Sequence, residues 1–359
     1  GLCRRLIART IWAAFIPSLV MGAASIVGLY ALARGLAAGR GVSLLAAALL
    51  SASPTHWICS SRIWLDATLT ALIVWAAAAL VRGDRPRWMW LSGVFWGLAF
   101  LVKYTAFAAW AGAIVAALLA KPEWRRSRKF WAAQALAFLI FAPWVLLRFA
   151  YDGWALFAIR NSNVEDWRSL SSLLGDVRIW VGAAVGCAAL FAITRPGSLR
   201  ILREVRPEWI AALALLIAVT LAAIFPDRLT EMPWSGWGSN EIANSPRWFY
   251  LARPLLFEPV VLWGCLGMLW AGWDREWHLA RGAWLGLFIF LTAWGNFQMR
   301  YGMPLLPFEH LFAAALLGAA FSTSGKPFRF TAVLIVAVSL LRSAWVISGM
   351  AIDNKFFYF

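Results

Sequence analysis

The chain has 359 residues, of which 62% are hydrophobic and only 14% are charged, and it contains 25 Trp and 24 Phe. This composition excludes a water-soluble domain and predicts a protein embedded in a lipid bilayer. The formal net charge of +16 does not indicate a nucleic-acid partner, because the basic residues are concentrated in short loops.

Apolar runs recur along the whole chain, and a membrane-spanning helix needs about 20 such residues. Several runs are shorter, and we interpret them as tilted helices or as helices packed within a bundle. We therefore expect an all-α, polytopic integral membrane protein with about twelve transmembrane helices in a single domain over residues 1–359. The predicted runs are 10–33, 42–58, 64–81, 88–102, 105–120, 130–149, 179–194, 209–225, 257–273, 282–298, 303–321 and 331–350.

Basic side chains cluster in the loops between these runs. Such clusters beside the ends of spans mark the cytoplasmic side of a membrane. We interpret them as topology signals, and no nucleic-acid partner is expected. The residues are Arg82, Arg85, Arg87, Lys121, Arg125, Arg126, Arg128, Lys129, Arg195, Arg200, Arg203, Arg206, Arg275, Arg281, Lys326 and Arg329.

Residues 88–120 form one long apolar stretch. As a single helix it measures about 50 Å, well beyond the roughly 30 Å hydrocarbon core. Because basic clusters flank both ends, we expect a hairpin that turns at residues 102–105. The same reasoning predicts a turn at residues 53–62. Asp66 then lies just below the outer surface of the membrane, and Lys103 lies at that surface.

The direction in which the first predicted span crosses the membrane follows from that of the second. If the run 42–58 ascends from the cytoplasm, the run 10–33 descends from outside and leaves the N-terminal arginines on the external face. The chain begins with Gly1 and shows no signal-peptide pattern. We therefore expect at least one upstream helix that this sequence lacks.

Two predicted external segments are longer than simple connections, residues 150–178 and 226–256. The first contains an amphipathic stretch at about 164–174, which suits the plane of the membrane interface. The second is rich in Trp, Gly and Pro. Two interpretations stay open for each: a lid over a lipid or glycan, or a loop anchored by aromatic residues at the headgroups.

Cysteine and histidine positions give little indication of a disulfide or a metal site. The four cysteines show neither a disulfide framework nor metal-type spacing. His56, His278 and His310 are far apart in the sequence, so no metal site is predicted, although a divalent metal remains possible. Glu309 adjoins His310 inside an apolar run, and we favour a structural hydrogen bond over a functional role for this pair.

Ionisable side chains inside a membrane raise the free energy of the folded protein, and they are therefore candidates for a functional site. Asp66 follows Arg62 by four positions, so the two share a helix face if the helix extends that far. Either they form a structural ion pair, or Asp66 has a catalytic or substrate-binding role. Lys103 suits a phosphate or extends to the lipid headgroups. Arg300 suits bidentate phosphate binding or anchors the interface.

Three segments resemble the GT-C glycosyltransferases, in particular the bacterial branch of the lipid A aminoarabinose transferases and relatives of the protein O-mannosyltransferases. They occur in the family's order, and the resemblance covers nearly the entire chain. They are Ser53-Pro54 through Ser61-Arg62 to Asp66, Gly97-Leu98-Ala99-Phe100-Leu101-Val102-Lys103, and Arg300-Tyr301-Gly302-Met303-Pro304-Leu305-Leu306-Pro307.

The resemblance implies a transferase that moves a sugar from a polyprenyl-phosphate carrier to a lipid, glycan or protein acceptor. Transfer is expected at the extracytoplasmic face of a bacterial inner membrane. Asp66 is expected to support catalysis, whereas the principal base belongs to a first external loop that this sequence lacks. Arg62, Lys103, Arg300 and Tyr301 are expected to bind the substrate.

The expected partners are the lipid-linked sugar donor and membrane lipids, and the sequence indicates no oligomeric state. An alternative function stays open, namely a transporter or flippase of a lipid-linked glycan with the same charges along its pathway. Transporters often contain inverted repeats with charges at the midplane. No internal symmetry is evident here, which favours the enzyme.

Overall fold

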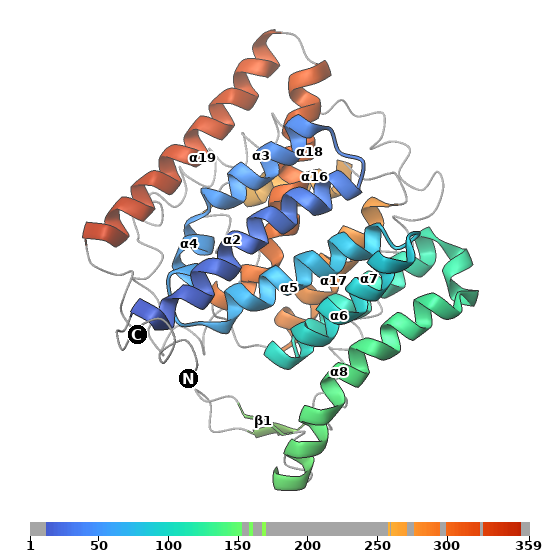
Figure 1. Ribbon diagram of the computed structural model, residues 1–359. Helices are drawn as coiled ribbons and strands as arrows, with labels where there is room; N and C mark the ends of the chain where they lie inside the picture. Colours follow the sequence, from blue (N-terminus) through green and yellow to red (C-terminus); the bar gives the residue numbers. More distant parts are fainter. Residues whose placement is uncertain are drawn as a thin grey trace.

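The computed structural model describes residues 12–152, 158–160, 167–169, 258, 260–270, 276–294, 299–323 and 326–352. These residues are almost entirely helical, which confirms the predicted all-α architecture (Figure 1). Four described helices are long and apolar enough to cross a membrane, or five if α3 and α4 form one bent span. The predicted count of twelve is therefore not confirmed, and the predicted runs 179–194 and 209–225 lie outside the described residues.

The described helices follow the apolar runs closely, and three of them end directly before a basic residue, namely Arg82, Lys103 or Lys121. They are α2 (Trp12–Gly35), α3 (Arg40–Ser51), α4 (Pro54–Ser60), α5 (Leu65–Val81), α6 (Pro86–Val102), α7 (Ala106–Ala120), α8 (Arg128–Asp152), α16 (Val260–Trp270), α17 (Trp277–Trp294), α18 (Leu306–Thr323) and α19 (Lys326–Ile352). Two 3-10 helices accompany them, η1 (Pro122–Arg126) and η3 (Met299–Leu305).

The predicted hairpin between α6 and α7 is confirmed. Lys103 ends α6 in an extended conformation, and α7 begins three residues later. At the other end of the hairpin, Lys121 after α7 forms an ion pair with Asp84 before α6, with Nζ 2.6 Å from Oδ2. The two basic loops therefore lie at one end of the bundle, as the charge pattern predicts.

The predicted run 42–58 is divided into two helices. Pro54 occupies the first turn of α4, and Ser53 caps this helix by accepting a hydrogen bond from the backbone N–H of His56. A proline suits the start of a helix but not its interior, because it has no N–H to donate. The axes of α3 and α4 are consequently bent by 61°.

Small residues allow the helices to approach closely. A Cβ atom added to Gly112 on α7 would collide with the backbone of Gly282 on α17, and one added to Gly93 on α6 would collide with Ala133 on α8. Gly264 on α16 is equally close to the backbone of α18. Such contacts are typical of helix packing in membranes, where van der Waals contact replaces the hydrophobic effect between helices.

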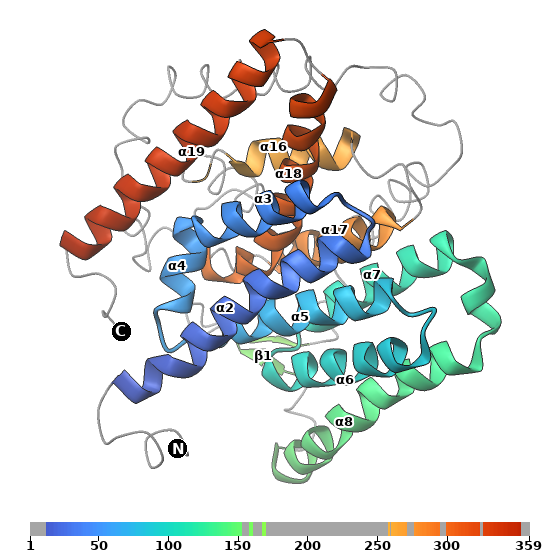
Figure 2. The ribbon, with the colours of Figure 1, turned by 45° about the horizontal axis from the view of Figure 1, so that its top comes forward.

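Helices α8 and α19 lie at opposite edges of the bundle (Figures 1 and 2). Both expose large apolar side chains, including Leu139 and Leu146 on α8 and Phe330 and Leu341 on α19, each 66–70% exposed. A soluble protein rarely leaves such surfaces uncovered. These exposed apolar edges therefore indicate contact with lipid, as in a multi-pass membrane protein.

The two predicted external segments fall mostly outside the described residues. Within the first, strand β1 (Ala158–Arg160) pairs antiparallel with strand β2 (Trp167–Ser169). Residues 167–169 of the amphipathic stretch at 164–174 therefore form a strand, and the rest of that stretch lies outside the described residues. Residues 226–256 lie outside the described part of the chain.

Candidate functional site

Three segments that are far apart in the sequence meet at the end of the bundle opposite the basic loops. They are the connection from α4 into the first turn of α5, the end of α6, and η3, which packs against both α4 and α5. They carry the side chains of Arg62, Trp64, Asp66, Lys103, Arg300 and Tyr301, which we call the cationic cluster. All five of the site residues predicted from the sequence belong to it.

Asp66 and Lys103 form an ion pair at the centre of the cationic cluster. The Nζ atom of Lys103 lies 2.8 Å from Oδ1 of Asp66. The carboxylate stands in the first turn of α5, where helix geometry favours negative charge. It is almost completely buried, whereas the lysine side chain retains 20% of its exposure. Lys103 thus keeps one side open to a ligand.

Tyr301 joins Lys103 to Arg300. The Lys103 Nζ atom lies 3.9 Å from the centre of the tyrosine ring, and the Arg300 guanidinium carbon lies 5.0 Å from it. Arg300 also donates a hydrogen bond of 3.3 Å from Nη2 to the tyrosine hydroxyl. Contacts between cations and aromatic faces are attractive, most strongly in sites shielded from water. The ring therefore offsets part of the repulsion between the two cations.

The ring of Trp64 likewise contacts two cations, Arg62 and Arg300. Its ring centre lies 4.9 Å from the guanidinium carbon of Arg62 and 5.1 Å from that of Arg300. Trp64 is also the residue that precedes α5, and its backbone carbonyl accepts a hydrogen bond of 3.2 Å from Ser18 on α2. The cationic cluster thus contains three cations and one carboxylate held together by two aromatic rings.

The alternative of an ion pair between Arg62 and Asp66 in one helix does not fit the structure. Helix α5 begins at Leu65, so Arg62 lies outside it and the i, i+4 relation does not apply. Asp66 forms an ion pair with Lys103 instead. Burial lowers the pKa of the Arg62 guanidinium, which nonetheless stays protonated in proteins. Arg62 therefore contributes positive charge to the cationic cluster.

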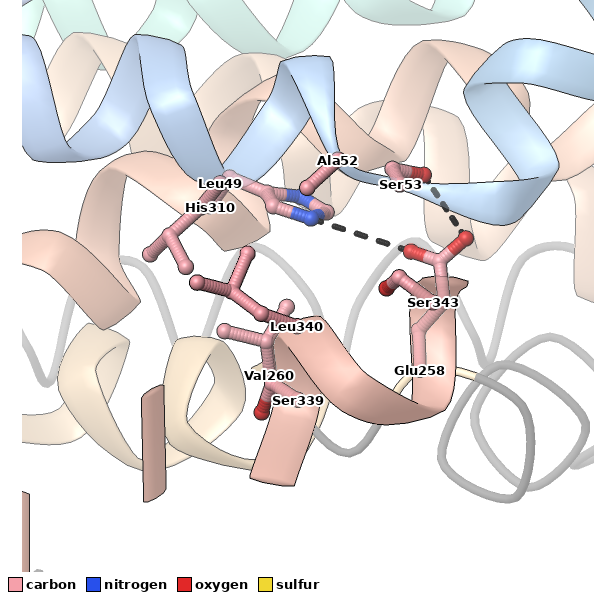
Figure 3. A pocket seen from close by; sticks show the side chains of 9 residues that line it. All are labelled: Leu49, Ala52, Ser53, Glu258, Val260, His310, Ser339, Leu340 and Ser343. Carbon is pink, nitrogen blue, oxygen red and sulfur yellow. Dashed lines mark hydrogen bonds and ion pairs between the residues drawn. The ribbon is translucent and has the colours of Figure 1, made fainter. Parts of the chain in front are cut away.

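A second polar group lies beside the start of α4, around Glu258. Oε1 of this buried carboxylate accepts hydrogen bonds from the Ser53 hydroxyl at 2.7 Å and from the Thr55 backbone N–H at 2.8 Å. Its Oε2 lies 3.7 Å from Nε2 of His310. Figure 3 shows Ser53, Glu258 and His310 around a small pocket that is lined by residues of α3, α16, α18 and α19. Glu258 is not among the site residues predicted from the sequence.

Glu309 and His310 are both buried in the bundle interior. Glu309 accepts a hydrogen bond of 2.9 Å from the Trp284 indole N–H on α17. This contact is a hydrogen bond of the kind predicted, and its purely structural role stays a prediction. His310 Nδ1 lies 2.7 Å from the Leu306 carbonyl oxygen.

The histidines have separate partners. His56 Nε2 lies 2.9 Å from the Ser25 hydroxyl, and His278 Nδ1 lies 3.1 Å from Arg281. Among the described residues no group of three His, Cys, Asp or Glu side chains is placed to hold a metal ion. Cys59 and Cys265 are free thiols, whereas Cys3 and Cys187 lie outside the described part of the chain.

Comparison with known proteins places these motifs in a family context. Residues 1–147 match the sequence profile of the dolichyl-phosphate-mannose-protein mannosyltransferase family. This match fits the predicted resemblance to GT-C glycosyltransferases and includes Arg62, Asp66 and Lys103 but not η3. No curated protein gives a significant match.

Two solved structures are similar to the chain, both of ArnT from Cupriavidus metallidurans. One is in the apo state and the other is bound to undecaprenyl phosphate. Each is 16% identical and covers 86% of this chain, with TM-scores of 0.41 and 0.40. The chain spans 65% of the length of these structures.

Proposed function

We propose that the chain is a membrane glycosyltransferase that takes a sugar from a polyprenyl-phosphate carrier. The acceptor is a lipid, a glycan or a protein at the extracytoplasmic face of a bacterial inner membrane. The family match over residues 1–147 and the motif resemblance support this proposal. The observation that carries it is the convergence of Arg62, Lys103 and Arg300 at a single end of the bundle, where Lys103 contacts Asp66 and both arginines contact Trp64.

The cationic cluster suits the phosphate of the carrier. A lysine ammonium has three N–H donors, and one of those of Lys103 is directed to Asp66. The others remain for phosphate oxygens. The guanidinium of Arg300 is planar and presents several donors in a fixed arrangement that matches a phosphate. Tyr301 and Trp64 both contact this guanidinium with their rings.

Asp66 has a supporting role in this proposal. Its Oδ1 accepts from Lys103, so the carboxylate orients the ammonium rather than acting on the acceptor. The reaction is a displacement at the anomeric carbon of the donor sugar. The bond from this carbon to the phosphate oxygen breaks, and its electron pair stays on the phosphate. The acceptor oxygen forms the new bond, and its proton passes to a general base.

The cations act mainly on the leaving group. Negative charge increases on the carrier phosphate as the bond to the sugar breaks. Preorganised positive groups in a site shielded from water stabilise such charge more strongly than water does. Lys103 and Arg300 are therefore the residues whose loss is expected to slow transfer most, and Arg62 is expected to contribute to carrier binding.

The proposal is tested with the purified full-length protein in proteoliposomes. Undecaprenyl phosphates carrying mannose, glucose or aminoarabinose serve as donors, membranes of the host serve as the source of acceptors, and released undecaprenyl phosphate is measured by mass spectrometry. We expect release that requires acceptor, and a loss of more than tenfold in Lys103→Ala and Arg300→Ala. Arg125→Ala, at the other end of the bundle, is the matched control and should retain activity.

Two results would overturn the proposal. Wild-type turnover in both Lys103→Ala and Arg300→Ala would remove the phosphate assignment. Movement of intact donor across the vesicle membrane without release of undecaprenyl phosphate would establish the transporter or flippase instead. Thermal unfolding of each variant separates a loss of activity from a loss of folding.

A further inference from the structure

Helix α4 lies between Glu258, which contacts its start, and the cationic cluster, which begins just after its end. It has only seven residues, and helices of this length are unstable without contacts at their ends. The chain leaves α4 through Ser61 and passes directly into Arg62 and Trp64. The position of α4 therefore determines where one side of the cationic cluster begins.

The start of α4 is held by Glu258, a residue more than 200 positions away in the sequence. One carboxylate oxygen, Oε1, accepts from both the Ser53 hydroxyl and the Thr55 backbone N–H. The Ser53 hydroxyl in turn accepts from the His56 N–H at 3.1 Å. Two of the backbone N–H groups at the start of the helix are thus satisfied, one by Glu258 and one by Ser53, whose hydroxyl Glu258 in turn holds.

The other carboxylate oxygen has a different environment. His310 Nδ1 lies next to a backbone carbonyl, which only accepts, so Nδ1 carries the hydrogen. Nε2 of His310 faces Oε2 of Glu258 at 3.7 Å, too long for a hydrogen bond. Among the described side chains, Oε2 of Glu258 has no hydrogen-bond partner. The contacts with α4 consequently depend on Oε1 alone.

We propose that Glu258 is a positioning residue for the cationic cluster, and that it acts by holding the start of α4 through Oε1. Arg62 and Trp64 stand at the far end of this helix and contact Arg300 through the Trp64 ring. Helix α4 also packs directly against η3, which carries Arg300 and Tyr301. Release of Glu258 lets α4 move relative to η3 and disperses the cations.

The role of the cationic cluster in carrier binding rests on the function proposed above, whereas the contact between Glu258 and α4 does not. The experiment therefore has two independent measurements on the full-length protein in nanodiscs. One is hydrogen exchange of the backbone amides in residues 54–66. The other is the Kd for undecaprenyl phosphate, which needs no knowledge of the sugar.

The decisive comparison is between Glu258→Ala and Glu258→Gln. Glutamine keeps a carbonyl oxygen at the position of Oε1, so the hydrogen bonds to α4 are retained. We expect amide exchange in residues 54–66 to increase at least tenfold in Glu258→Ala, and to stay within threefold of wild type in Glu258→Gln. The Kd should weaken more than tenfold in Glu258→Ala and less than threefold in Glu258→Gln.

Glu309→Ala is the matched control. It removes another buried carboxylate, one that contacts Trp284 on α17 rather than α4, and exchange in residues 54–66 should stay at the wild-type rate. If Glu258→Ala does not fold, Ser53→Ala removes one of the two hydrogen bonds and should increase exchange by a smaller factor.

Unchanged exchange in both Glu258→Ala and Ser53→Ala would overturn the proposal. So would equal damage from Glu258→Gln and Glu258→Ala, because the charge rather than the acceptor oxygen would then be needed. A wild-type protein that fails to bind undecaprenyl phosphate would defeat the proposed function, while the exchange measurement would still decide the role of Glu258.

Discussion

Lys103 and Asp66 are 37 positions apart and stand at the ends of different helices, yet the Lys103 ammonium lies 2.8 Å from the Asp66 carboxylate. This contact fastens the end of α6 to the beginning of α5. It also places the turn between α6 and α7 at the same end of the bundle as the connection between α4 and α5. The ion pair therefore links the hairpin topology to the candidate site.

Removal of either member of this pair should destabilise the protein. A buried carboxylate or ammonium without its partner costs roughly 3 kcal/mol, and we expect about this loss in Asp66→Asn and in Lys103→Met. The double variant should be more stable than the sum of the two losses predicts, with a coupling energy of about 1 kcal/mol or more. Thermal unfolding in detergent measures all four proteins. Strictly additive losses would show that the pair contributes nothing.

Trp64 should affect carrier affinity more than turnover. Its ring contacts two guanidinium groups, and each such contact contributes about 0.5–1 kcal/mol. We expect Trp64→Leu to weaken binding of undecaprenyl phosphate by roughly 5- to 30-fold, because two such contacts are lost. Trp64→Phe retains an aromatic face and should lose less.

The control for this prediction is Trp90→Leu, which removes an exposed tryptophan from α6. Equal weakening in Trp64→Leu and Trp90→Leu would mean that the loss reflects general destabilisation. No weakening in Trp64→Leu would remove the tryptophan from the binding site.

The sequence predicted the helices well because their limits depend on local chemistry. Helix α5 spans Leu65–Val81 where the apolar run 64–81 was predicted, and α7 spans Ala106–Ala120 against 105–120. The division of the run 42–58 was not predicted as two helices. Pro54 and the Ser53 cap mark it, but a hydropathy run continues across such a short interruption.

The contacts of the candidate site were harder to predict. An i, i+4 relation is visible in a sequence, so the sequence suggests Arg62 as a partner for Asp66. The observed partner is Lys103, and this contact depends on how α5 and α6 pack. Glu258 has no local signal, because Ser53 and Thr55 are more than 200 positions away. Trp64 is one of 25 tryptophans, and its contacts with Arg62 and Arg300 depend on how α4, α5 and η3 pack.

The direction of the bundle in the membrane is a separate prediction. The charge pattern indicates that the loop at 121–127 faces the cytoplasm and that the turn at 102–105 faces outside. A single cysteine at Tyr104, on a background without the four native cysteines, should react with an impermeant maleimide in intact cells. A cysteine at Arg125 should react only after the membrane is permeabilised. The reverse pattern would place the cationic cluster on the cytoplasmic side and defeat transfer at the outer face.

Helix packing gives a prediction that does not depend on function. A Cβ atom at Gly112 would overlap the Gly282 carbonyl oxygen where α7 crosses α17, whereas one at Gly41 would meet nothing within 4 Å. Gly112→Ala should therefore destabilise the protein by about 1–3 kcal/mol, because the helices must separate. Gly41→Ala lies near the start of α3 and should be neutral or stabilising by up to about 1 kcal/mol.

The two alanine variants make the same chemical change in two helices, so intrinsic helix propensity is matched and only the space around the new methyl group differs. Thermal unfolding in detergent compares them with wild type. An equal or higher unfolding temperature for Gly112→Ala would mean that α7 and α17 do not cross at these glycines. Since α5 packs against both of these helices, the arrangement that brings Asp66 to Lys103 would then also have to differ.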